Sequence, residues 1–202
     1  MKPNPTIDFL LWALTHVRPD SIPEGAALAA PHERCGIDPW EYLFGTSGQV
    51  CTQKILDERF SSAYSEFGWG SISFEAITND WAEQGVSVCD GPGLLNAYRK
   101  QICGIQSAMT EHGIFSRICC DKAAIGETYR AFEPGEAVFI SNRYGLMKRV
   151  GWVCGFDAQD EPLVIEARGL CYGVCIAPFR GRGWTHRARM NLMLDKEDAD
   201  AD

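Results

Sequence analysis

Apolar positions along the chain follow a helical period in its first half and a strand period in its last third. The helical period predicts amphipathic helices over residues 6–17, 52–67 and 73–84. Short apolar or alternating runs bounded by turn residues predict strands over residues 137–141, 149–156, 163–168 and 173–178. Helices followed by an antiparallel sheet place the chain in the α+β class.

A central helix is predicted to begin at Gly91-Pro92, because proline in the first helical turn loses no needed hydrogen bond. Its buried face is given by apolar residues at helical spacing, Leu94, Leu95, Tyr98 and Ile102. Cys89 lies just before this helix N-terminus, where the helix dipole and the free backbone N–H groups favour a thiolate. Cys89 is therefore a candidate nucleophile, provided that the chain also supplies a base.

Three segments depart from these periods. Residues 18–38 are rich in proline, glycine and alanine, which predicts a long loop or insertion. Residues 113–136 form a predicted linker, and the acidic run 195–202 is predicted to be a disordered, solvated tail. A chain of 202 residues with 46% hydrophobic content can bury one core, so we expect a single domain over residues 1–194.

The charge and the cysteine content narrow the expected partners and compartment. A net charge of -8 argues against nucleic acid, which needs a basic surface, and against unaided attachment to an anionic membrane. No stretch is long and apolar enough to span a bilayer, and the N-terminus lacks the features of a signal peptide. The nine cysteines show no regular spacing, so we expect a reducing cytoplasm. No cofactor is expected, and the sequence specifies no oligomeric state.

Short motifs in a fixed order then suggest a family. They are Asp90-Gly91-Pro92-Gly93-Leu94, Glu133-Pro134-Gly135-Glu136-Ala137-Val138-Phe139, Arg149-Val150-Gly151-Trp152-Val153, Val164-Ile165-Glu166-Ala167-Arg168-Gly169 and Arg182-Gly183-Trp184-Thr185. From about residue 6 to about residue 189 the chain resembles the NlpC/P60 family of papain-like cysteine peptidases, especially its phage- and gut-bacterium-associated branch. The resemblance implies a papain-like fold and an enzyme that cuts the peptide stems of bacterial cell wall.

The chain departs from that family at both main catalytic positions. The family opens its central helix with Asp-Cys-x-Gly-Leu, and aligning the Gly-Leu puts Gly91 at the nucleophile position. Aligning the cysteine instead makes Cys89 the nucleophile and requires two extra residues before Leu94. We prefer the first alignment, because it needs no insertion in the first helical turn. The histidine of the family's His-Val-Gly motif is replaced by Arg149, whose guanidinium cannot accept a proton near neutral pH.

The resemblance also implies a position for the residue that orients the histidine, and a cleft for the substrate. Glu166 falls at the place of the residue that orients the histidine, and we hypothesise that it forms an ion pair with Arg149. The alternative is that Arg149 points to solvent. Asp90 and the aromatic residues Trp40, Tyr42 and Phe44 are candidate substrate-binding residues, although core packing explains the three aromatics equally well. The spacing of Cys154, Cys171 and Cys175 does not fit a zinc site, so no metal is expected.

The sequence therefore favours an NlpC/P60-like domain with a degraded peptidase centre. Such a domain would bind a peptidoglycan peptide or a protein partner without cutting it. The alternative is an active cysteine endopeptidase or amidase that uses Cys89, with a base such as His32 supplied by the insertion. A weaker option is an acyl-transfer enzyme on the same fold.

Overall fold

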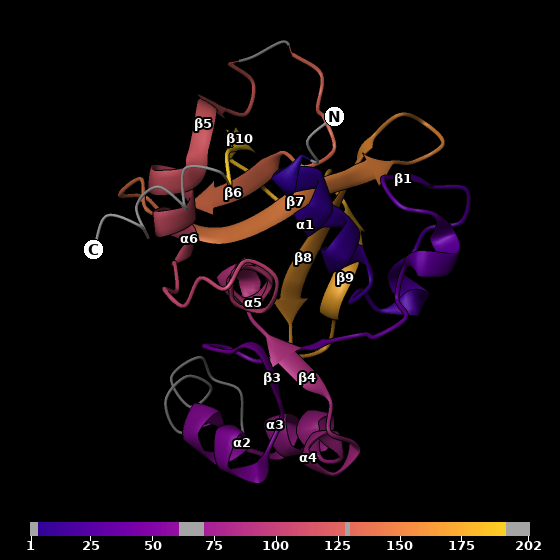
Figure 1. The fold of residues 1–202 in the computed structure, drawn as a ribbon, viewed down its shortest axis with the longest axis vertical. Coiled ribbons are helices and arrows are strands. Elements are labelled where there is room, and N and C mark those ends of the chain that lie inside the picture. Colours follow the sequence, from indigo (N-terminus) through magenta and orange to yellow (C-terminus); the bar gives the residue numbers. More distant parts are fainter. Residues whose placement is uncertain (1–3, 61–70, 128–129, 193–202) are drawn as a thin grey trace.

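An antiparallel sheet forms the centre of the molecule in the computed structural model, which describes residues 4–60, 71–127 and 130–192. The strands follow the order β5-β10-β6-β7-β8-β9, with the short β1 paired to β7 (Figure 1). Their bounds are β1 Ala27–Leu28, β5 Cys119–Ala124, β6 Ala137–Ser141, β7 Met147–Phe156, β8 Pro162–Gly169, β9 Gly173–Pro178 and β10 His186–Met190. Mixed helices and a large antiparallel sheet confirm the α+β class.

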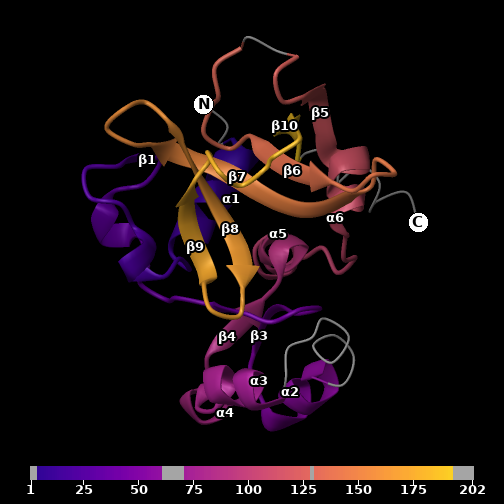
Figure 2. The ribbon, with the colours of Figure 1, turned by 180° about the vertical axis from the view of Figure 1, so that it is seen from behind.

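Two helices, α1 (Pro5–Leu14) and α5 (Gly91–Gln101), cover one face of this sheet (Figures 1 and 2). The Asn4 side chain caps α1 by accepting from the Thr6 amide at 3.1 Å, and Pro5 occupies the first turn. Phe9 of α1 then packs edge-on against Trp152 of β7, with ring centroids 4.9 Å apart. The main core is therefore the layer between these helices and the sheet.

A smaller, three-stranded sheet carries the start of α5. Its order is β2-β4-β3, with bounds Glu41–Tyr42, Ser87–Cys89 and Ser47–Val50 respectively. Beside it lie three helices, seen at the bottom of Figure 1, which are α2 (Gln53–Arg59), α3 (Ser71–Thr78) and α4 (Trp81–Gln84). They share a second apolar cluster with β4 through Val88 and Leu56.

The helix predictions hold in part. The helix expected over residues 6–17 is α1, and the helix expected over 73–84 is divided into α3 and α4. Only α2 is described within the helix expected over 52–67, because residues 61–70 lie outside the described part of the chain. The predicted tail also lies outside it.

Four strands are confirmed close to their predicted bounds, as β6, β7, β8 and β9. The prediction of a linker over 113–136 is wrong, because this segment continues the short helix α6 (Glu111–Gly113) with a helical turn over Ile114–Ile118 and then forms the strand β5. Residues 18–38 are not simply a loop, because β1 pairs with β7. Two short 3-10 turns flank β1, at Pro19–Ser21 and His32–Arg34.

Candidate functional site

Cys89 is enclosed by backbone pairing and by the core. It ends β4 and pairs with Tyr42 of β2 on one side and with Ser47 of β3 on the other. Its side chain is 0% exposed and belongs to the main core. Burial, followed by the negative charge of Asp90, raises the pKa of the Cys89 thiol well above its ordinary value. The thiol is therefore protonated at neutral pH, in contrast to the thiolate expected from its place before a helix.

Asp90 acts as the N-cap of α5. Its carboxylate accepts hydrogen bonds from the amide of Gly93 at 2.7 Å and from the amide of Gly45 at 2.8 Å. Burial raises the pKa of this carboxyl, while the two amide bonds and the positive charge of Arg59 oppose the increase. One carboxylate oxygen thus caps α5 and the other ties the helix start to the loop before β3, which is a structural use of the residue proposed for substrate binding.

The two glycines of the first turn of α5 have different surroundings. A Cβ at Gly93 would lie 2.0 Å from the carbonyl oxygen of Thr46, so no side chain fits there. A Cβ at Gly91 would have Val150 Cγ1 at 3.7 Å as its nearest neighbour, which is ordinary van der Waals contact. A Cβ therefore fits at the position where the preferred alignment expects a cysteine, and it would face β7.

The residue of β7 that faces Gly91 is Val150, not Arg149. Arg149 pairs with Ile140 across β6 and β7, and paired residues project from the same face of a sheet. Ile140 packs with the apolar cluster on the face away from α5, whereas Val150 belongs to the main core. Alternation along the strand thus directs Arg149 away from the position where a base would have to meet the first turn of α5.

The predicted ion pair between Arg149 and Glu166 is wrong. Glu166 accepts two hydrogen bonds from Arg182, to Nε at 2.7 Å and to Nη2 at 2.6 Å. The exposed Arg149 instead donates to the carbonyl oxygen of Arg168 at 3.5 Å. Arg182 can reach Glu166 because the segment between β9 and β10 crosses this face of the sheet, a long-range arrangement that strand patterns do not encode.

All four histidines lie in the described residues, and their hydrogen bonds are with groups other than Cys89. His16 contacts the Asp38 carbonyl oxygen at 3.0 Å through Nδ1, and His186 contacts the Thr185 hydroxyl at 2.9 Å. His32, the suggested base from the insertion, lies 2.8 Å from the carbonyl oxygen of Ala26 within the same segment. His112 is exposed on α6.

The three candidate cleft aromatics are distributed between core and surface. Trp40 is buried, stacks on His16 with ring centroids 4.0 Å apart and donates to the Asp38 carboxylate at 3.1 Å. The prediction that Trp40 lines a cleft is therefore wrong, because its indole completes the core under α1. Tyr42 is half-buried against the same core, and Phe44 is 46% exposed.

Glu111 is the residue near this site that the sequence did not single out. It begins α6, which packs against β7. Burial raises the pKa of its carboxyl and the charge of Asp90 adds to the increase, whereas Lys148 and Arg149 act in the opposite direction. Glu111 is thus within electrostatic reach of Asp90, Lys148 and Arg149. The Thr110 side chain caps α6, which is the local signal that predicts a helix start there.

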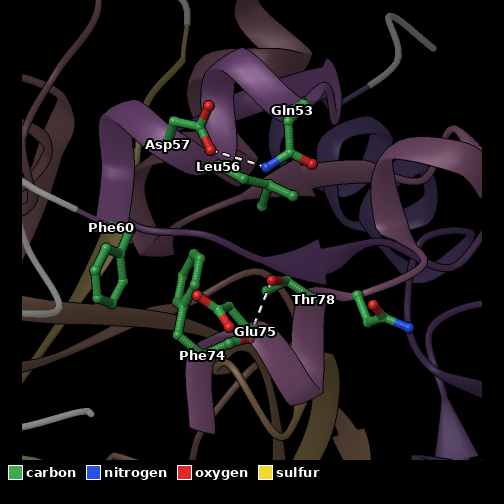
Figure 3. Close-up of a pocket in the computed structure, with 8 residues that line it drawn as sticks. Gln53, Leu56, Asp57, Phe60, Phe74, Glu75 and Thr78 are labelled. Atoms are coloured by element: carbon green, nitrogen blue, oxygen red, sulfur yellow. Dashed lines mark hydrogen bonds between the residues drawn. The ribbon is translucent and has the colours of Figure 1, made fainter. Parts of the chain in front are cut away.

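A cavity of about 320 Å³ lies elsewhere, between α2 and α3 (Figure 3). Its lining includes no residue of the small sheet or of α5. In the described part of the chain, no three or more histidine, cysteine, aspartate or glutamate side chains are grouped to hold a metal ion. None of the described helices combines the length and the apolar character needed to cross a bilayer.

Comparison of the chain with protein-family models, with curated proteins and with solved structures finds no match.

Proposed function

We propose that the chain is an NlpC/P60-like domain that has lost its peptidase centre and binds a peptide, a cell-wall fragment or a protein partner. One observation carries the proposal. The side-chain position that faces the sheet from the first turn of α5 is Gly91, and across from it stands Val150. Neither residue can supply a nucleophile or a base, and the neighbouring Cys89 is buried as a thiol.

The charges around Glu111 support a role in binding. Glu111 and Asp90 are partly buried, and the exposed cations Lys148 and Arg149 both interact electrostatically with Glu111. A site that offers both signs of charge suits a peptide that carries carboxylate and ammonium groups. Soluble stem peptides of bacterial peptidoglycan are peptides of this kind.

The experiment measures binding and cleavage in one sample. Purified stem peptides are titrated into the full chain by calorimetry, and the same mixture is then analysed by mass spectrometry for cleaved products. We expect saturable binding with intact peptide. Replacing Lys148 and Arg149 together with glutamate should weaken binding about tenfold, because the charges of the two cations near Glu111 are reversed.

The matched control is the double variant Arg34→Glu and Lys54→Glu, which makes the same change in net charge at two exposed cations that lie on other elements than α6 and β7. It should bind as the wild type does. Absence of binding by the wild type would overturn the proposal. Cleavage that disappears in Cys89→Ser would instead establish the cysteine peptidase, with Cys89 as its nucleophile.

A further inference from the structure

The cavity between α2 and α3 has a lining that is both aromatic and acidic. The side chain of Leu56 points from α2 into the space, and the rings of Phe60 and Phe74 stand together at one end (Figure 3). The centroids of these two rings are 5.2 Å apart, with their planes at 46°. The exposed carboxylates of Asp57 and Glu75 complete the lining at the solvent side.

The charge of the lining has one sign. Of the eight described residues that line the cavity, two are acidic and none is basic. Gln53 donates to the Asp57 carboxylate at 2.8 Å, which fixes that group on the side of α2. The lysine of α2, Lys54, lies 3.9 Å from Glu58, and neither residue belongs to the lining. The described lining therefore includes two carboxylates and two aromatic rings, which are the groups that attract an organic cation.

We propose that this cavity binds an alkylammonium group. The carbon atoms attached to an ammonium nitrogen pack against aromatic faces. The positive charge of the ammonium group is attracted both to the rings and to nearby carboxylates. The volume of about 320 Å³ is within the range of small-molecule sites and exceeds what a bare metal ion needs. The group belongs either to a quaternary amine or to the protonated amine of a lysine-type side chain. This proposal does not depend on the function proposed above.

The test uses choline, its neutral carbon isostere 3,3-dimethylbutan-1-ol, and n-butylammonium as probes for the full chain. Binding is followed by calorimetry and by the chemical shifts of the phenylalanine rings. Choline or butylammonium should bind saturably at millimolar concentrations, and the neutral isostere should bind at least about tenfold more weakly. A preference for choline identifies the quaternary amine, and a preference for butylammonium identifies the lysine-type amine.

Variants locate the binding in the cavity. The double variant Asp57→Asn and Glu75→Gln should lower affinity at least about tenfold, and both positions are exposed, so the fold should tolerate them. Phe60→Leu should also weaken binding while keeping apolar volume. The control Glu58→Gln removes a carboxylate of the same helix outside the lining and should bind as the wild type does. Equal binding of choline and its neutral isostere, or no binding of either cation, would overturn the proposal.

Discussion

Glu166 and Arg182 form a bidentate ion pair on the face of the sheet away from α5, and the Glu166 side chain is only 2% exposed. Arg182 lies in the segment that follows β9 and Glu166 lies in β8, so the pair holds that segment against the sheet. It also removes Glu166 from any role beside Arg149.

Breaking this pair should destabilise the fold strongly. Glu166→Gln leaves the partly buried Arg182 without its counter-charge, and we expect a loss of about 3 kcal/mol in the free energy of unfolding. Glu161→Gln is the matched control, because its partner Arg180 is 80% exposed, and such a pair contributes about 0–1 kcal/mol. Urea unfolding of both variants gives the comparison. Equal losses for the two variants would contradict the buried pair.

Cys89 should be among the least reactive thiols of the protein. Its side chain is buried and its pKa is raised by burial, whereas Cys120 and Cys171 are exposed. Alkylation of the native protein, followed by mass spectrometry, should show Cys89 reacting at least about 100-fold more slowly than Cys171. A Cys89 that reacts as fast as Cys171 would point back to the active peptidase.

The two glycines at the start of α5 should respond in opposite ways to alanine. Gly93→Ala places a methyl group against the Thr46 carbonyl and should cost about 2–4 kcal/mol of stability. Gly91→Ala meets only an ordinary contact with Val150 and should be neutral or stabilising by up to about 1 kcal/mol, since alanine is the better helix former. The urea midpoints of the two variants measure this directly. A destabilised Gly91→Ala would show that Gly91 is required by packing.

His16 should make stability depend on pH below neutrality. Burial lowers its pKa from the ordinary value of 6.5, and the hydrogen bond and charge of Asp38 oppose only part of that change. The unfolded chain therefore takes up the proton first. The stability from neutral His16 is complete above pH 6.5 and is lost progressively as the pH falls from 6.5 toward the folded-state pKa.

The measurement is the free energy of unfolding between pH 7.5 and about pH 5. His16→Gln should reduce the slope by up to about 1.4 kcal/mol per pH unit. His112→Gln, at an exposed position on α6, should keep the wild-type slope. An unchanged slope in His16→Gln would mean that the imidazole is not held neutral.

The start of α5 and the strand β6 are cases in which local sequence was sufficient. The helix α5 begins at the predicted Gly91-Pro92, directly after its capping residue Asp90. The strand β6 has the predicted bounds, Ala137–Ser141. Both signals are complete within a few residues, because they depend on proline geometry, a capping side chain and a run of apolar residues.

The strand β10 shows why other elements could not be predicted. Its sequence is HRARM, and Arg187, its second residue, is buried. That guanidinium is paired with Glu136 and donates to the Ala131 carbonyl oxygen at 2.8 Å. A buried charge is tolerated only where such partners converge, and these partners lie more than 50 residues away in the chain.

For the candidate site, the sequence by itself determined the residue types: a cysteine and an aspartate before a helix, glycine in its first turn, and arginine where a base is expected. Only the tertiary structure decided what those residues can do. It buried the Cys89 thiol, turned Arg149 away from Gly91 and gave Glu166 to Arg182. The reason is physical, because desolvation, strand register and ion pairing depend on atoms brought together from distant parts of the chain.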